Sequence, residues 1–314
     1  MDLSIIIVNW NTKKLLFECL ESIYKNTKEI ALEIIVIDNA SADGSAEMIK
    51  RNYTKVNLIK SDINLGFARA NNIAFEHTTG RYILLLNSDT VVKEKALDLA
   101  VSFLDQNKRV GALTPMILND DESIQHPCYI KDPSLISELY DAFELTRLFG
   151  IKRLDSIPAQ NTVCNVLHAC GCSLFLRKEA IDKVGYLDER MIFSYEDADI
   201  CFRIRKNGWI IQYYPESKII HYGGASRSKH KRRAVDAMLK SKYVYYGKYH
   251  SSIYIYAISI ILILSSSIKL IIYYMLLFNK STRDKTKIKI YYYIAIIKWH
   301  FTPLRNRTDH KGMS

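Results

Sequence analysis

The stretch Leu3–Asn11 (LSIIIVNWN) decides the fold, because a short aliphatic run ends abruptly in polar residues. Such a run, rich in β-branched residues, predicts a strand buried on both faces. It lacks the basic leader and the cleavage site of a signal peptide, so we expect it to be structural. The polar residues that follow would then stand at the carboxyl end of the strand.

The same pattern returns along the first 115 residues. Further strands are expected at 34–37, 56–59, 82–86 and 110–113, and helices near 13–26, 44–52, 67–77 and 94–106. This alternation predicts a mostly parallel α/β sheet covered by helices on both faces. Ligands of such sheets bind beyond the carboxyl ends of the strands. The polar segments at those ends are Asn9–Asn11, Asp38–Ser41 and Asn87–Asp89, so we expect them to form a pocket.

The pattern weakens after residue 115. Residues 116–160 contain three prolines and no clear periodicity, and we interpret them as an insertion with one short helix near 134–148. Order returns with a strand at 172–177, helices at 178–184 and near 197–207, and a strand at 209–214. The composition then becomes basic and apolar. We therefore predict a catalytic domain over 1–225 and a membrane-associating tail over 226–314.

Charge and cysteine content narrow the class of protein. The chain has 314 residues with 44 Lys and Arg against 33 Asp and Glu, a net charge of +11. The basic runs at 227–248 and 280–289 bracket an apolar segment, which favours an anionic membrane over nucleic acid as the partner. The six cysteines have no zinc-like spacing, so we expect free thiols in a reducing cytosol.

The apolar segment at 253–278 is long enough to cross a bilayer, which needs roughly 20 residues. Ser265–Ser267 and Lys269 interrupt it, and a central lysine costs about 2.5–3.5 kcal/mol on insertion. Three arrangements remain open: a span, a re-entrant hairpin or an interfacial helix with both ends in the cytosol. A soluble helix packed on the catalytic domain is the fourth.

Acidic residues and one histidine stand where chemistry is expected. Asp38 can accept hydrogen bonds from a base or ribose, and Asp89 can bind Mg²⁺ or Mn²⁺, although each could simply be a turn residue. The cluster Glu196–Asp199 begins a predicted helix, whose dipole alone would favour acids there. Three acids in four residues exceed that need, so one is a candidate general base. His221 could supplement a metal site poor in carboxylates.

Together these segments resemble the family 2 glycosyltransferases of the GT-A fold, especially rhamnosyltransferase-like members of surface-polysaccharide pathways. The resemblance covers roughly the first 70% of the chain, from Ser4 to about Ser226. It rests on five segments in order, which are Ser4–Asn11, Val36–Ser45, Asn64–Asn72, Leu85–Asp89 and Gly185–Arg203.

The resemblance implies roles residue by residue. The nucleoside would be held by Asn9, Asn11 and Asp38, and the donor pocket lined by Asn64, Gly66, Asn71 and Asn87. Asp89 would bind the divalent metal. Asn87 replaces the first acid of the family's Asp-x-Asp motif, so the metal would lean more on His221. Asp197 would be the base of an inverting transfer, with Glu196 as the alternative.

The implied substrates are a nucleotide-diphosphate sugar (dTDP-, UDP- or GDP-linked) and a hydroxyl of a lipid-linked or polysaccharide acceptor, at the cytoplasmic face of the membrane. Two other functions remain open. A sugar-phosphate nucleotidylyltransferase would want a glycine- and lysine-rich phosphate loop near the N-terminus, which this sequence lacks. A non-catalytic membrane assembly protein would not need Asp38, Asp89 and Asp197.

Overall fold

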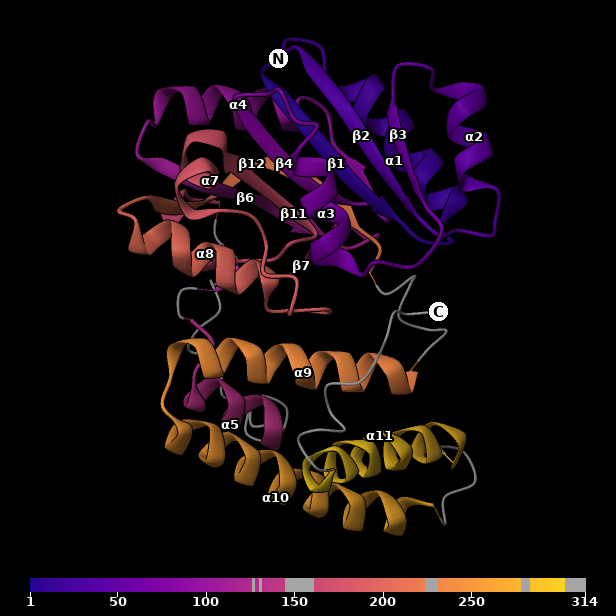
Figure 1. Ribbon diagram of the computed structural model, residues 1–314, viewed down its shortest axis with the longest axis vertical. Coiled ribbons are helices and arrows are strands. Elements are labelled where there is room, and N and C mark those ends of the chain that lie inside the picture. The colour runs from indigo at the N-terminus through magenta and orange to yellow at the C-terminus, as the bar shows by residue number, and fades with distance from the viewer. Residues whose placement is uncertain (126–127, 130–131, 145–160, 224–230, 278–282, 303–314) are drawn as a thin grey trace.

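A large mixed sheet carries the first part of the chain (Figure 1). The computed structural model describes residues 1–125, 128–129, 132–144, 161–223, 231–277 and 283–302. Within these ranges the strand order is β3-β2-β1-β4-β11-β6-β12-β5, with β7 beside β6 and β9 beside β12. The strands are β1 (Leu3–Asn9), β2 (Leu32–Asn39), β3 (Asn57–Ser61), β4 (Tyr82–Asn87), β5 (Thr90–Val92), β6 (Val110–Leu118), β7 (Ile124–Gln125), β9 (Cys164–Asn165), β11 (Ser173–Arg177) and β12 (Ile210–His221). A separate pair joins β8 (Cys128–Tyr129) to β10 (His168–Ala169).

Helices cover both faces of this sheet and form a further layer below it (Figure 1). The helices are α1 (Lys13–Asn26), α2 (Ser45–Asn52), α3 (Phe67–Phe75), α4 (Ala96–Gln106), α5 (Leu135–Phe143), α7 (Lys178–Val184), α8 (Glu196–Lys206), α9 (Lys231–Tyr249), α10 (Ser252–Leu276) and α11 (Arg283–Phe301). Alternate residues of β1 enter opposite cores, because side chains of a strand alternate between its two faces. Ile5 packs with α1 and α4, and Ile6 packs with α3 and α8.

The predicted mostly parallel α/β fold is confirmed. β2, β1 and β4 are parallel neighbours, as are β6 and β12, whereas β11 runs antiparallel between β4 and β6. Every strand and helix expected in the first 115 residues is present. The short strands β5, β7, β8, β9 and β10 were not predicted, since two or three residues leave no periodicity to read.

β12 is longer than the predicted strand, which ended at residue 214. The strand passes Pro215 and Glu216 with a shift in its register to β6 and continues to His221. The proline interrupts the apolar run and hides the continuation, because proline within a run normally ends a strand. The added length of strand carries His221 to the edge of the pocket.

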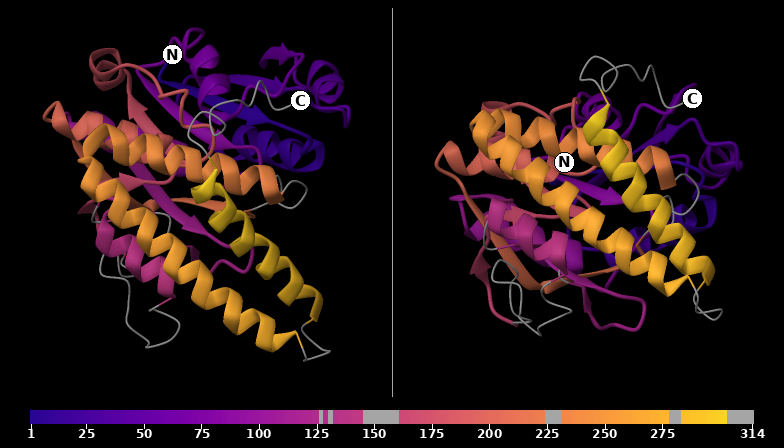
Figure 2. Two further views of the ribbon diagram at one scale, coloured as in Figure 1. Left: turned by 60° about the horizontal axis from the view of Figure 1, so that its bottom comes forward. Right: turned by 90° about the horizontal axis from the view of Figure 1, so that it is seen from below.

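Below the sheet and the helices on its two faces lies a further layer, which consists of α5, α9, α10 and α11. We call it the helical layer. α9 lies under the sheet domain, and α10 lies outermost between α5 and α11 (Figure 2). Buried side chains of α9, including Leu239 and Tyr246, pack with Met191 and Ala198 of the sheet domain. The predicted boundary at residue 225 stays a prediction, and α9 is firmly attached across it. The helix expected near 134–148 is α5, which ends at Phe143. Residues 145–148 of the expected range lie outside the described residues.

Candidate active site

Three parallel strands bring their polar ends to one edge of the sheet. Asn9 at the end of β1 is the register partner of Asp38 in β2, and Val8 is the partner of Asn87 in β4. These residues are far apart in the sequence, and they lie together in the fold because the carboxyl ends of parallel strands meet at the same edge of the sheet.

The first group lies around Asn9, which is fully buried. Its Nδ2 donates to Asp38 Oδ1 at 3.2 Å and to Ser41 Oγ at 3.1 Å. The backbone N–H of Asn11 donates to the same Ser41 Oγ at 3.0 Å, and Asn11 Oδ1 accepts from the N–H of Ala42 at 2.8 Å. The predicted nucleoside residues Asn9, Asn11 and Asp38 therefore form one hydrogen-bonded cluster.

The backbone at this cluster is strained. Asn11 has φ 54° and Ala40 has φ 64°, in the left-handed region that non-glycine residues seldom occupy. Such conformations cost on the order of 1–3 kcal/mol and concentrate at binding sites, where surrounding contacts hold them. The Ser41 hydrogen bonds supply those contacts here.

Asn64 and Gly66 lie in a loop beside this cluster. Asn64 Oδ1 accepts from the side chain of Asn39 and from the N–H of Gly66, both at 3.0 Å. Asn39 Oδ1 in turn accepts from the N–H of Leu65 at 2.7 Å. Asn71 does not join them: it is buried in α3, and its Nδ2 donates to Phe67 O at 2.9 Å.

The second group joins the end of β4 to the end of β12. His221 Nε2 lies 3.4 Å from Asp89 Oδ1 and 3.5 Å from Asn87 Nδ2. On the other side of the ring, Nδ1 is 2.8 Å from Gln125 Oε1. The Gln125 amide is fixed because its Nε2 donates to Asn119 Oδ1 and to the backbone O of His221. An amide oxygen only accepts, so Nδ1 carries a proton, and Nε2 faces Asp89.

This pairing fits a divalent metal. A carboxylate oxygen and an unprotonated imidazole nitrogen facing each other are suitable ligands for Mn²⁺ or Mg²⁺, and they repel each other without a cation or proton between them. Among the described residues no cluster of three or more His, Cys, Asp or Glu is suited to a metal. Asp89 and His221 would thus supply two ligands and leave the remaining positions to a diphosphate and water.

The third group is centred on Asp197 at the start of α8. Asp197 Oδ2 accepts from the N–H of Gly171 at 2.9 Å, and Oδ1 lies 3.5 Å from His168 Nε2. Burial raises the pKa of this carboxyl, but the hydrogen bond and charge of His168, with the N–H groups of Gly171 and Ala198, outweigh it and lower the pKa below its ordinary value. Asp197 is therefore ionised at neutral pH.

Glu196 is in the opposite state. Burial, and then the negative charge of Asp197, raise the pKa of Glu196 well above its ordinary value. Its Oε2 is buried and has no hydrogen-bond partner among the residues that the structure describes. Adjacent carboxyls in a shared buried site cannot both ionise readily, so the pair holds one charge, and it resides on Asp197.

Asp89 and Asp197 both lie close enough to Cys172 for their charges to act on its thiol. The Cys170 side chain and burial, followed by the charges of Asp197 and Asp89, raise the pKa of Cys172 well above its ordinary value. Asn87 N–H donates to Cys172 O at 3.0 Å. The nucleoside cluster joins the same centre through Thr12, which bonds Asn9 Oδ1 at 2.6 Å and Ser88 Oγ at 2.8 Å.

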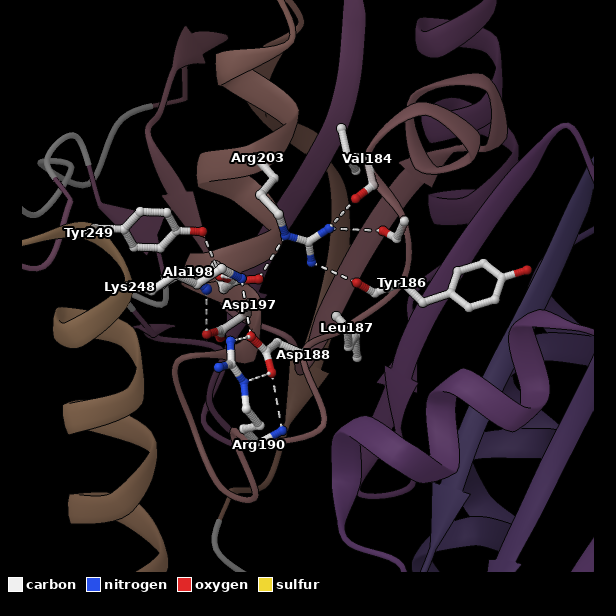
Figure 3. A network of polar contacts seen from close by, with 12 residues as sticks. Val184, Tyr186, Leu187, Asp188, Arg190, Asp197, Ala198, Arg203, Lys248 and Tyr249 are labelled. Carbon is white, nitrogen blue, oxygen red and sulfur yellow. Dashed lines mark hydrogen bonds and ion pairs between the residues drawn. The ribbon is translucent and has the colours of Figure 1, made fainter.

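A buried ion-pair network attaches the start of α8 to α9 (Figure 3). Asp199 is fully buried and accepts from Arg203 Nε at 2.8 Å, Lys248 Nζ at 2.6 Å and Tyr249 OH at 2.6 Å. Lys248 also reaches Asp188 at 3.1 Å. Asp199 therefore serves the scaffold, and the remaining acids of the cluster are Glu196 and Asp197.

The turn before the acids is strained as well. Ser194 and Tyr195 have φ 66° and 72°. The Tyr195 hydroxyl donates to Glu138 Oε1 of α5 at 3.0 Å, and Glu138 Oε2 accepts from Lys242 of α9 at 2.5 Å. The helical layer thus fixes the backbone that presents Glu196.

Several site residues carried no signal in the sequence. Gln125 lies in the insertion without periodicity, and His168 follows an apolar run where a histidine is ordinarily structural. Gly171 acts through its backbone N–H, which no residue type reveals. His168 lies in β10, which pairs with β8, and Gly171 lies just before β11, which pairs with β4. Gln125 lies in β7, which pairs with β6 beside β12. The cysteines whose side chains are described, Cys19, Cys164, Cys170, Cys172 and Cys201, are free thiols as expected.

Comparisons with known proteins agree with this arrangement. The family model described as glycosyl transferase family 2 matches residues 4–185. The N-acetylglucosaminyl-diphospho-decaprenol L-rhamnosyltransferase of Mycobacterium tuberculosis is 26% identical over 242 residues, covering 71% of this chain and 77% of that protein.

Solved structures are similar over nearly the whole chain. The mannosyltransferase PcManGT from Pyrobaculum calidifontis, in complex with GDP-Man and Mn²⁺, has a TM-score of 0.55 at 18% identity, covering 95% of this chain and 86% of that one. TarS 1-349 of S. aureus, in complex with UDP-GlcNAc, has a TM-score of 0.51 at 15% identity, covering 95% and 91%. At these identities the likeness concerns the fold.

Proposed function

The chain belongs to glycosyl transferase family 2, a family of enzymes that use nucleotide sugars, and we propose that it is a metal-dependent, inverting hexosyltransferase with a lipid-linked saccharide acceptor. One observation carries the proposal. An ionised Asp197, an Asp89–His221 pair and the Asn9–Asp38 cluster converge at one edge of the sheet. Each group matches one requirement of the reaction.

The donor end is served by the Asn9 cluster. Asp38 would accept hydrogen bonds from the base or ribose, with Asn9 and Ser41 fixing its carboxylate. Asn11 would complete the nucleoside site, and the loop of Asn64 and Gly66 would line the donor. Asn87, the last residue of β4, lies 3.5 Å from His221 and would line the donor beside the metal pair. Asn71 supports the loop from within α3.

The diphosphate end is served by Asp89 and His221, which would hold Mn²⁺ or Mg²⁺. When bound, the ion offsets the negative charge of the departing nucleoside diphosphate. Gln125 keeps the His221 proton on Nδ1. The sugar nucleotides bound in similar structures, GDP-Man and UDP-GlcNAc, support a nucleotide-diphosphate sugar as donor.

The acceptor end is served by Asp197. Its carboxylate would take the proton of the acceptor hydroxyl while the acceptor oxygen attacks C1 of the sugar. The new C1–O bond forms opposite the C1–O bond to the diphosphate that breaks, so the configuration inverts. The pKa of Glu196 is raised well above its ordinary value, and in its protonated form Glu196 would donate a hydrogen bond to the acceptor. The rhamnosyltransferase relative supports L-rhamnose as the sugar and a polyprenyl-linked saccharide as the acceptor, which would place the reaction at the cytoplasmic face of the membrane.

A donor screen tests this proposal. Melting temperatures would be measured with dTDP-, UDP- and GDP-sugars, each with and without Mn²⁺, and the best donor would then be assayed for turnover. We expect one nucleotide class to stabilise the protein only with metal. Stabilisation without turnover on any lipid-linked acceptor would favour a non-catalytic assembly protein, and no stabilisation by any donor would refute the proposal.

A further inference from the structure

The outermost helix, α10, exposes a continuous stripe of apolar side chains. Its members recur every three or four residues and are between 48% and 81% exposed: Ile253, Tyr256, Ile260, Leu264, Ile268, Ile271 and Met275. Residues at this spacing lie on one face of a helix. We call them the apolar stripe. With a rise of about 1.5 Å per residue the stripe is about 33 Å long.

The opposite face of α10 holds the polar residues and points into the protein. Ser265 and Ser266 are buried. Lys269 Nζ pairs with Glu144 Oε1 at 3.0 Å and lies 5.3 Å from the ring centre of Tyr293. Lys269, which interrupted the apolar segment of the sequence, is therefore satisfied by the protein.

This geometry separates the arrangements left open by the sequence. α10 is the one helix among the described residues that is long and apolar enough to cross a membrane. It packs lengthwise on α5, α9 and α11 (Figure 2), so only one of its faces is available to lipid. A span would pull Lys269 away from Glu144 and place its charge in hydrocarbon, whereas a helix lying in the plane of the interface keeps the pair.

Charge indicates what covers the stripe. α10 contains no Asp or Glu, and residues 280–314 contain nine Lys or Arg against two Asp. The side chain of Lys287 on α11 is 59% exposed. Anionic lipid headgroups attract such a basic flank. Tyr256, Tyr274 and Tyr291, each at least 49% exposed, add the aromatic side chains that prefer the interface.

We propose that α10 lies in the plane of an anionic membrane leaflet, with the apolar stripe inserted among the lipids and the sheet domain held in water. The consequence for catalysis rests on the proposed lipid-linked acceptor. Because Lys248 and Tyr249 of α9 hold Asp199 of α8, Asp197 stands at a fixed height above the leaflet. An acceptor anchored in that leaflet would meet the base without leaving the membrane.

Vesicle binding of the full chain tests the stripe. Sedimentation with phosphatidylcholine vesicles, with and without phosphatidylglycerol, would compare the parent with L264E/I268E. We expect the double variant to lose at least about 100-fold in partitioning, roughly tenfold for each apolar side chain exchanged for a charge. The matched control is F17E/Y24E on α1, whose residues are 40% and 38% exposed and lie away from the helical layer. It should bind vesicles like the parent.

The depth of insertion along α10 distinguishes a helix that lies in the plane of the membrane from one that spans it. Tryptophan would replace Tyr256, Leu264 or Met275 singly, and quenching by lipids brominated at different acyl positions would be measured above the parent signal. The proposal expects the same shallow depth at all three positions. Depth that changes steadily along α10 would overturn it in favour of a span.

Three other results would also overturn the proposal: equal binding by L264E/I268E, release of the parent by high salt alone, and a stripe-dependent dimer that does not bind vesicles. Melting temperature and Mn²⁺-dependent donor binding, measured on the same variants, report the proposed function separately. Loss of donor binding by the parent would contradict that function and leave the vesicle result standing.

Discussion

The Nε2 atom of His221 lies 3.4 Å from Oδ1 of Asp89, although the two residues come from the ends of β12 and β4. The antiparallel pairing of β5 with β12 creates this relationship, since His221 is the register partner of Thr90, the residue after Asp89. The N–H of Tyr222 donates to Asp89 O at 3.0 Å and closes the same corner. The candidate metal pair is thus fixed by backbone pairing on both sides.

Replacing Asp89 by alanine removes the only carboxylate of the pair. Asp89→Ala should abolish transfer and metal-dependent donor binding together, because His221 alone would hold the ion weakly. Isothermal titration of donor with and without Mn²⁺, alongside a turnover assay, measures both. An active Asp89→Ala enzyme, or full activity of the parent in chelator, would rule out the metal-dependent mechanism.

Gln125 should matter through His221 rather than through substrate. Gln125→Leu removes the acceptor of the Nδ1 proton, so the ring can turn and protonate on either nitrogen. The apparent Mn²⁺ affinity should fall by about 10- to 100-fold, the usual effect of losing a partner of a metal ligand. Gln106→Leu, the same exchange at an exposed glutamine at the end of α4, is the control. An unchanged Mn²⁺ titration of Gln125→Leu would show that His221 is not a ligand.

The sheet and its pocket edge could be predicted because the signals there are local. Aliphatic runs such as Ile5–Val8 identify strands buried on both faces, and the polar residues after them identify strand ends. Asn9 and Asp38 were therefore placed beside each other correctly. The partners of the acids could not be predicted. Gln125, His168 and Gly171 reach the site through the pairing of β7 with β6, of β10 with β8 and of β11 with β4, and neither spacing nor residue type encodes those pairings.

Buried charge explains why α9 could not be assigned from composition. The run from Arg227 to Lys248 is basic and suggested a solvated or membrane-facing segment. In the structure Lys248 is drawn inward by Asp199, whose carboxylate is fully buried. The sequence alone cannot show that Lys248 points inward, because its partner Asp199 lies on a different helix, α8.

Removing Lys248 should therefore destabilise the protein. Lys248→Met leaves Asp199 with Arg203 and Tyr249 but one charged hydrogen bond fewer, a loss of about 1.5–3 kcal/mol. Urea unfolding measures it. Lys14→Met, which breaks the exposed pair with Glu18 on α1, should change the free energy of unfolding by about 0–1 kcal/mol. Equal stability of both variants would contradict a structural role for the Asp199 network.

The pair of His168 and Asp197 should produce a defined pH dependence. Asp197 has a lowered pKa, so its contribution to stability is present above the ordinary value of 3.8 and is lost as pH falls through the lowered value. Burial lowers the pKa of His168, but the Asp197 hydrogen bond raises it overall, so its contribution is present below 6.5 and is lost as pH rises through the raised value. The pair should stabilise most between these two pH values.

His168→Gln tests this assignment with two readouts. The variant should lack the extra stability, measured as a higher melting temperature, that the parent has between pH 3.8 and 6.5. The acidic limb of the turnover profile should move to higher pH, because the charge that lowers the pKa of Asp197 is gone. If His168 were purely structural, its replacement would lower the melting temperature at every pH and leave the acidic limb of the turnover profile in place.

The final prediction separates Asp197 from Glu196. Asp197→Asn keeps size and polarity but deletes the basic oxygen, so turnover should fall by about 10²–10⁴ while donor affinity survives. Glu196→Gln should cost less, because the raised pKa of Glu196 favours its protonated form and glutamine can still donate a hydrogen bond. Turnover, donor binding and melting temperature would be measured on both variants.

The alternative, in which these acids only stabilise the start of α8, makes a different forecast. Each substitution would then cost about 1 kcal/mol of stability with turnover largely retained. The buried Oε2 of Glu196 sharpens the comparison, since the neutral Glu196→Gln variant avoids any charge beside Asp197 and should not destabilise the helix. A stable Asp197→Asn enzyme with near-normal turnover would refute Asp197 as the base. An inactive Glu196→Gln beside it would move the base to Glu196, and would mean that donor binding draws the shared charge from Asp197 onto its neighbour.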